Sequence, residues 1–136
     1  MPIDRPLKLE LRKLLHMQSA VPVLKKMSPL LLVANIEHSI EFYTEKLGFS
    51  LDFRYEDFYA GIVKDGHSIH LKCGASAPAD KEHLEITFSV DGIERLYQEI
   101  LNKSVEIVQP LRDMPYGREF YISDLDGNHI SFLEEG

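Results

Sequence analysis

The chain of 136 residues lacks the features that mark secreted and membrane proteins. Cys73 is its only cysteine, so an internal disulfide is excluded and a reducing cytoplasm is the expected compartment. No apolar run approaches the roughly 18 residues of a membrane span, and no apolar signal-peptide core follows the first residues. The sequence therefore predicts a cytoplasmic protein without a membrane partner.

Positive charge is also scarce, since 15 Lys and Arg stand against 22 Asp and Glu and give a net charge of −7. This acidity argues against nucleic acid as a partner and would favour cationic ligands, although ordinary solubility charge accounts for most of it. A phosphate loop and a glycine-rich dinucleotide fingerprint are both absent. The hydrophobic fraction of 44% is ample for one compact unit, or for two small halves sharing a core.

An internal repeat organises the chain. The stretch 124–134 combines a strand end, a tight Asp-Gly turn and a closing strand, because Gly accepts positive φ and Asp bonds back to its own backbone. The segment 64–71 superposes on 125–132 without a gap, which places His70 at the position of Ser131. Further upstream, 31–36 matches 88–93 as a strand followed by a helix start. The sequence therefore predicts two divergent copies of one unit.

Each copy is predicted to contain a strand, a helix and three further strands. Apolar stripes at helical spacing predict helices over 36–47 and 93–101, and alternation predicts the strands. The segment 110–117, with Met-Pro-Tyr-Gly at its tip, is predicted as a loop. The resulting fold class is α+β, with two βαβββ modules whose sheets are mixed or antiparallel.

The predicted domain boundaries follow from this order. An N-terminal extension occupies residues 1–27 and contains a short predicted helix over 6–16. The first module spans 28–74 and the second 83–136, joined by a linker of small residues at 75–82.

Each helix is expected to cover one face of a curved sheet, which leaves the other face open. The alternation places strictly apolar residues on the covered face and more polar ones on the open, concave face. A concave face of that kind lines either solvent or a ligand cleft. The residues expected on this face, or on the loop above it, are Ser28, Leu30, His70, Glu85, Thr87, Tyr116, His129 and Ser131.

The segments 31–49 and 117–130 resemble the vicinal oxygen chelate superfamily. This superfamily groups glyoxalase I, extradiol dioxygenases, fosfomycin resistance proteins and bleomycin resistance proteins. The resemblance covers about residues 27–135, and Leu125 departs from it by standing where the family commonly has Pro. It implies helices outside a cleft and a homodimer, but it leaves function open because the fold hosts many chemistries.

The resemblance also implies four metal positions, which fall on Ser28, His70, Glu85 and Ser131. The two serines are neutral hydroxyls and poor ligands for Zn, Ni, Fe or Mn. A displaced metal set of His70, Glu85 and His129 remains an alternative. The favoured expectation is that no cofactor binds and that His70 and Glu85 are polar groups lining a pocket.

These expectations favour a protein similar to bleomycin resistance proteins, which sequesters a bulky small molecule in a dimer cleft without a metal. Glu85 would attract a cationic group of the ligand, and aromatic side chains such as Tyr116 would contact the rest. The alternative is a glyoxalase-like lyase of the lactoylglutathione lyase type, in which a divalent metal polarises vicinal oxygens while Glu85 moves a proton. A second alternative is a catalytically silent structural dimer.

Overall fold

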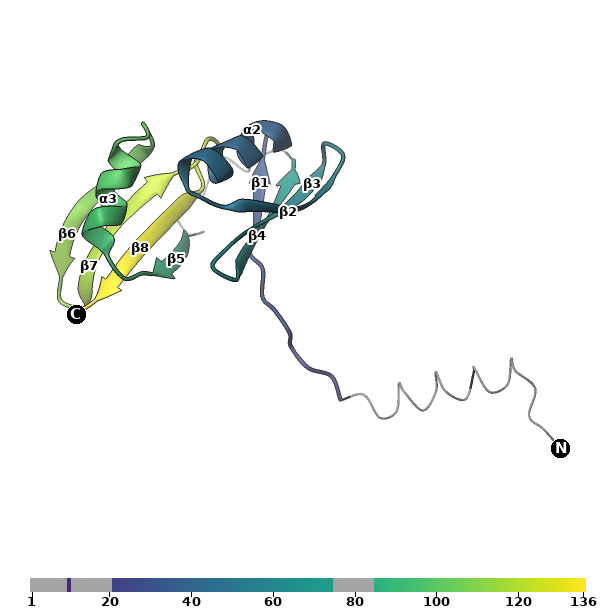
Figure 1. The fold of residues 1–136 in the computed structure, drawn as a ribbon, viewed down its shortest axis with the longest axis horizontal. Helices are drawn as coiled ribbons and strands as arrows, with labels where there is room; N and C mark the ends of the chain where they lie inside the picture. The colour runs from purple at the N-terminus through teal and green to yellow at the C-terminus, as the bar shows by residue number, and fades with distance from the viewer. Residues whose placement is uncertain (1–9, 11–20, 75–84) are drawn as a thin grey trace.

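The structure is a computed structural model that describes residue 10, residues 21–74 and residues 85–136. The linker prediction at 75–82, and the helix predicted over 6–16 apart from residue 10, therefore lie outside the described residues. The described chain forms two four-stranded sheets, each with a helical layer on one face (Figure 1). The predicted α+β fold of two βαβββ modules is confirmed.

The first module contains four strands and one helical stretch. Its elements are β1 (Leu30–Val33), α2 (Ile36–Glu41), η1 (Phe42–Lys46), β2 (Ser50–Tyr55), β3 (Tyr59–Lys64) and β4 (His67–Cys73). The sheet order is β1-β4-β3-β2, with β1 parallel to β4 and the other pairs antiparallel. The side chain of Asn35 accepts a hydrogen bond from the His38 N–H at 2.9 Å and so caps α2.

The second module repeats this arrangement. Its elements are β5 (Glu85–Ser89), α3 (Ile93–Leu101), β6 (Glu106–Met114), β7 (Gly117–Ser123) and β8 (His129–Glu135). The sheet order is β5-β8-β7-β6, and β5 runs parallel to β8. The carboxylate of Glu134 accepts a hydrogen bond from the Ile93 N–H at 2.9 Å and thereby caps α3.

The prediction of a loop over 110–117 is wrong. Strand β6 continues to Met114, and only Pro115 and Tyr116 form the turn into β7. Pro110 fits inside β6 because this strand lies at the edge of the sheet, where a missing N–H donor costs no ladder bond. Register shifts on both sides of Gln109 interrupt the pairing with β7, as expected where the ladder bulges.

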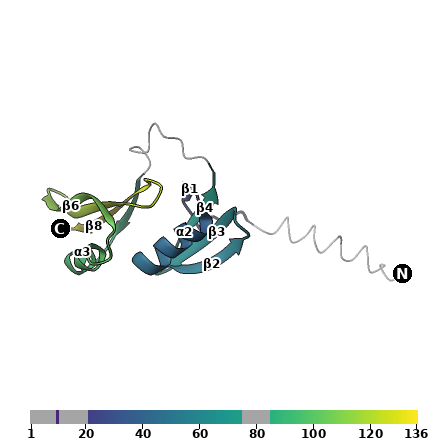
Figure 2. The ribbon, with the colours of Figure 1, turned by 90° about the horizontal axis from the view of Figure 1, so that it is seen from above.

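The two modules share one hydrophobic core, and the covered face of the first sheet is turned toward the second module. Phe49, next to β2, packs against Phe88 on β5 with ring centroids 6.3 Å apart. Tyr43 on η1 donates a hydrogen bond to the Asp124 carboxylate at 2.8 Å. The helical layer α2–η1 therefore lies between the sheets, and the open face of the first sheet points away from the second module (Figures 1 and 2).

The Asp-Gly turn before β8 also links the modules. The carboxylate of Asp124, two residues before the Asp126-Gly127 pair, accepts hydrogen bonds from the N–H groups of Asp126 and Asn128 at 2.9 and 2.8 Å, and the Asp126 carboxylate accepts from the Ala34 N–H of the first module at 2.8 Å. The amide of Asn128 reaches the first module and donates to the Leu32 carbonyl at 3.1 Å. Gly127 has φ of 82°, which its lack of a side chain permits.

Candidate functional site

The open face of the first sheet is an aromatic surface built around His70. The parallel register sets Leu30 directly beside His70. The Tyr59 hydroxyl and His70 Nδ1 are 2.7 Å apart, and the Phe53 ring meets the His70 ring edge-on at 5.2 Å. Gly61 lies between them in the ladder, and a Cβ there would come within 2.2 Å of the Phe53 ring. Gly61 therefore gives Phe53 the room to lie across the sheet.

Large apolar side chains on this face remain exposed in the single chain. Leu30 is 50% exposed, Tyr55 59% and Phe58 56%. Tyr55 and Phe58 stack with ring centroids 6.4 Å apart. A contiguous apolar surface of this kind is typical of a site that meets a ligand or another protein chain.

Ser28, the other candidate on this side, lies just before β1. Its hydroxyl and that of Ser68 are 2.5 Å apart, so the two form a hydrogen-bonded pair. Each is therefore engaged with the other.

The open face of the second sheet carries the remaining strand candidates. The parallel pairing of β5 with β8 places Glu85 beside His129 and Thr87 beside Ser131. Glu85 and Thr87 are exposed at the sheet edge, whereas Ser131 is buried. The structure thus brings together all four candidates that the sequence assigned to this sheet.

A buried carboxylate, Glu119 on β7, is the polar centre of this second face. Arg112 on the neighbouring strand β6 contacts it at 2.6 Å through the guanidinium, and the Tyr121 hydroxyl donates to it at 2.6 Å. Tyr116, the candidate on the turn, donates to the other oxygen. The Arg112 guanidinium also lies 5.6 Å from the centroid of the Tyr121 ring, a cation–π geometry.

These contacts decide the charge states of the cluster. Burial by itself would raise the pKa of Glu119, but the hydrogen bonds from Tyr116, Tyr121 and Arg112 outweigh it and lower the pKa below its ordinary value. The bond to Glu119 raises the pKa of Tyr116 to about 12. Glu119 is therefore a carboxylate that is fully occupied by donors, which suits it to fixing Arg112 and Tyr116 and not to accepting a proton from a substrate.

Sequence reasoning missed Arg112 and Glu119. Glu119 was detectable, since alternation along 118–123 sets it opposite the buried Phe120 and Ile122. Arg112 was hidden by the wrong loop prediction, which concealed that it faces Glu119 across a strand pair.

The predicted site residues form two groups on two separate sheets within one chain. Leu30 and His70 belong to the first sheet, and Glu85, His129 and Ser131 belong to the second. Among the described residues, no group of three or more His, Cys, Asp and Glu side chains is placed to hold a metal ion. The displaced set of His70, Glu85 and His129 is accordingly not assembled inside a single chain.

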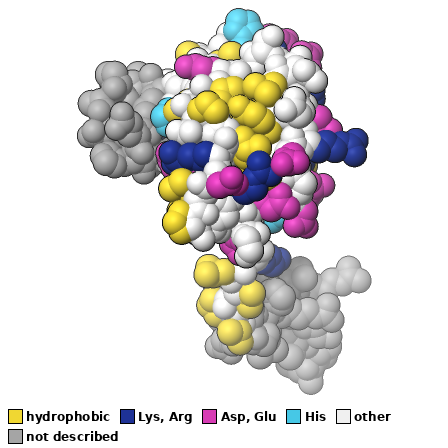
Figure 3. Space-filling model, turned by 90° about the vertical axis from the view of Figure 1, so that its left-hand side faces the viewer, with side chains coloured by type: hydrophobic (Ala, Val, Ile, Leu, Met, Phe, Trp, Pro, Cys, Tyr) yellow, Lys and Arg dark blue, Asp and Glu magenta, His cyan; other side chains and the backbone are white. Residues whose placement is uncertain are grey.

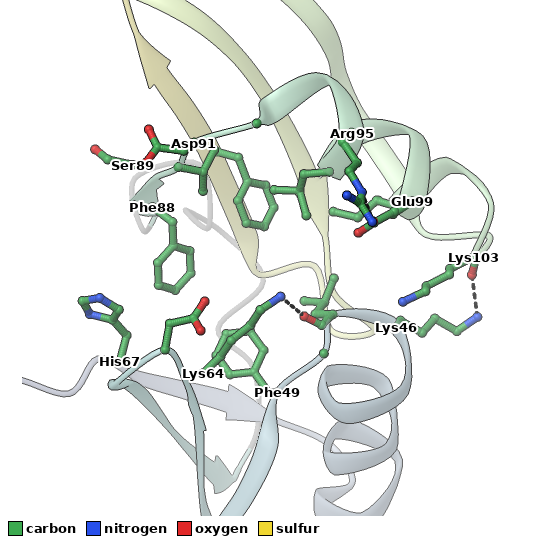
Figure 4. Close-up of a pocket in the computed structure, with 18 residues that line it drawn as sticks. Lys46, Phe49, Lys64, His67, Phe88, Ser89, Asp91, Arg95, Glu99 and Lys103 are labelled. Carbon is green, nitrogen blue, oxygen red and sulfur yellow. Dashed lines mark hydrogen bonds and ion pairs between the residues drawn. The ribbon is translucent and has the colours of Figure 1, made fainter.

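A cavity of about 860 Å³ lies between the two modules, away from the open sheet faces, and is lined in part by residues of η1 and α3 (Figure 4). None of the site residues predicted from the sequence lines it. Its apolar wall comes from both modules and consists of Leu47, Phe49, Phe88, Val90, Leu96, Ile100 and Phe132. This volume is within the range of small-molecule sites.

The end of the molecule formed by β6 and α3 also exposes apolar side chains. Figure 3 shows them gathered as a patch with charged side chains around it. Val108 on β6 is one of the exposed residues of this strand. Across the described ranges, no helix is long and apolar enough to cross a membrane.

The family model named Glyoxalase/Bleomycin resistance protein/Dioxygenase superfamily matches residues 17–132. The chain belongs to this superfamily. The resemblance inferred from 31–49 and 117–130 is thereby confirmed, and the family model extends upstream into residues that the structure does not describe.

Curated relatives in this superfamily include bleomycin resistance proteins. Those of Geobacillus stearothermophilus and Staphylococcus aureus are each 32% identical, with 79% of this chain and 94% of the relative covered. Among solved structures, the bleomycin-binding protein of Streptomyces verticillus complexed with copper(II)-bleomycin superposes with a TM-score of 0.70 at 20% identity, covering 85% of this chain and all of that one. TioX from Micromonospora sp. ML1 gives 0.71 at 18% identity, covering 82% and 99%. At these identities the two structures support the fold alone.

Proposed function

We propose that this superfamily member is a metal-independent binding protein that sequesters a bulky, cationic small molecule. The binding cleft would form between the open face of the first sheet in one chain and that of the second sheet in another. The observation that carries the proposal is the exposed aromatic surface around His70, which a single chain leaves uncovered. The curated bleomycin resistance relatives support the same function class.

The donor chemistry of the open faces argues for binding in place of metal catalysis. Two of the four positions that the family resemblance assigns to a metal carry hydroxyls, and one of them, Ser28, is already bonded to Ser68. Neutral hydroxyls are poor ligands for a catalytic divalent ion. These residues therefore do not fit a four-ligand metal site.

The same faces offer the contacts that a large cationic ligand needs. Phe53, Tyr55 and Tyr59 supply ring faces and edges, which contact planar or cationic groups with little loss of side-chain entropy. Glu85 is an exposed carboxylate on the second face and would attract a positive group. Tyr116 and Arg112, held by Glu119, would present a rigid polar contact.

The test is calorimetric titration with metal-free bleomycin and other cationic glycopeptides, together with thermal shifts. We expect stoichiometric binding and a rise in Tm, because a ligand that binds only the folded state stabilises it. Gly61→Ala should weaken binding about tenfold, since the new Cβ displaces the Phe53 ring, while Gly136→Ala, whose Cβ would meet nothing within 4 Å, serves as control.

Two results would overturn the proposal. One is a stoichiometric zinc or nickel site with turnover of a hemithioacetal, which would establish the glyoxalase-like lyase. The other is the absence of binding by every compound of the panel, which would favour a structural dimer.

A further inference from the structure

The cavity between the modules is separate from the open sheet faces and has an apolar middle. Phe49 from the first module and Phe88 from the second project into it from different sides (Figure 4). Phe49 and Phe132 are nearly buried in the core, so the cavity is continuous with the interior where both modules meet. The cavity opens to solvent, and its volume of about 860 Å³ is large enough for a small molecule.

Charge is distributed unevenly along this cavity. Lys46 and Lys103 lie together at one end, and Asp91 and His67 lie at the other (Figure 4). The ammonium of Lys46 donates to the Lys103 carbonyl oxygen at 2.7 Å, which fixes it at that end and leaves two of its N–H donors available. Within the described ranges, the Lys103 ammonium has no ion-pair partner.

The other lysine and arginine side chains that line the cavity are engaged. Arg95 pairs with Glu99 at 3.1 Å, and the Lys64 ammonium donates to the Leu47 carbonyl at 2.9 Å. Lys46 and Lys103 therefore offer an anion the most favourable electrostatic interaction along the cavity, in a chain whose net charge is −7.

We propose that this cavity is a second binding site, for an amphipathic carboxylate. The hydrocarbon or aromatic body of the ligand fills the apolar space between Phe49 and Phe88, and its carboxylate lies at Lys46 and Lys103. The site is independent of the sheet-face cleft, so each can exist without the other.

The probe is decanoate, titrated below its micellar concentration into the ¹⁵N-labelled full chain and followed by NMR. We expect saturable shifts at the amides of Gly48, Gly92 and Lys103, which border the cavity, and none at His70 or Glu119. Decyltrimethylammonium has the same chain with a cationic head and should bind at least about tenfold more weakly. Equal or tighter binding of the cation, or shifts confined to the sheet faces, would overturn the proposal.

Variants then test the contact with the carboxylate and the contact with the apolar part of the ligand separately. Lys46→Met with Lys103→Met keeps the side-chain length, removes both charges and should weaken decanoate binding roughly tenfold. Lys72→Met, an exposed lysine on β4, is the matched control and should leave the affinity unchanged. Leu96→Trp should fill the cavity and abolish the shifts. Undiminished decanoate binding by this variant, or by the double lysine variant, would contradict the proposed site.

Discussion

Glu119 is the single residue whose ionisation should be most visible in the stability of the protein. Three side chains donate to its buried carboxylate, and the net effect is a pKa below the ordinary value of 4.5. As pH falls below 4.5, the unfolded chain takes up a proton at this position while the folded chain does not. Glu119 therefore stabilises the fold above that pH, and its contribution is lost progressively as pH drops toward the folded pKa.

This predicts a difference in pH dependence that urea denaturation can measure. The free energy of unfolding of the wild type should fall more steeply between about pH 4.5 and pH 3 than that of Glu119→Gln, which cannot ionise there. Glu85→Gln removes an exposed carboxylate from the same face and is the control for general acid effects. Parallel curves for wild type and Glu119→Gln would mean that the carboxylate is not held as described.

Residue by residue, alternation explains why part of the site was predictable. It correctly placed His70 and Ser131 on faces opposite the buried Ile69 and Ile130, because each side-chain face of a strand recurs every second residue. Alternation carries no information on partners across the sheet. The Tyr59–His70 and Arg112–Glu119 contacts depend on strand register, which only the folded chain provides.

At the level of elements, the helical stretch η1 is attached to the second module through one buried hydrogen bond. Tyr43 is almost completely buried, and its hydroxyl donates to Asp124, whose other contacts come from the backbone of 126–128 and from the Asn128 amide. Burial, followed by the proximity of Asp124, raises the pKa of the Tyr43 phenol, so that it remains a donor. This bond therefore joins a π-helical turn to the Asp-Gly turn of the other module.

Removing this bond should weaken the junction between the elements. Tyr43→Phe keeps the ring contacts with Phe42 and Phe49 but leaves a buried acceptor with one donor fewer, and we expect a loss of about 1.5–3 kcal/mol in the free energy of unfolding. Tyr97→Phe is a matched control, because Tyr97 packs its ring on Phe120 and should cost less than about 0.5 kcal/mol. A Tyr43→Phe protein as stable as the control would rule out this role.

Element boundaries also show where tertiary contacts override local sequence preferences. Pro110 and the Met-Pro-Tyr-Gly segment favour a loop, yet β6 extends to Met114 because residues 112–114 pair again with β7 after the bulge. The stripe of Ile36, Ile40, Tyr43 and Leu47 predicted a continuous helix, and it is continuous, but its second half is π-helical. Apolar spacing determines which face of a helix is buried. It does not determine whether each N–H bonds to the carbonyl four or five residues before it.

For the whole molecule, the proposed cleft requires a second chain. The covered face of the first sheet faces the second module, so its open face cannot meet the open face of the second sheet in the same chain. Leu30, Leu32, Tyr55 and Phe58 remain exposed in the single chain. Soluble monomers rarely expose contiguous apolar surface of this kind.

We therefore expect a homodimer in sedimentation velocity, and a charge on the open face should dissociate it. Leu32→Glu introduces that charge at a side chain 37% exposed on β1, and it should shift the population toward monomer and reduce bleomycin binding. Leu101→Glu is the matched control, since this leucine is 41% exposed at the end of α3, on the helical side of the second module. Both variants exchange a similarly exposed leucine for glutamate. A difference in dimerisation between them therefore arises from the face that carries the substitution and not from the added charge. A wild type that remains monomeric at all concentrations, or a Leu32→Glu protein that dimerises like Leu101→Glu, would place the partner surface elsewhere.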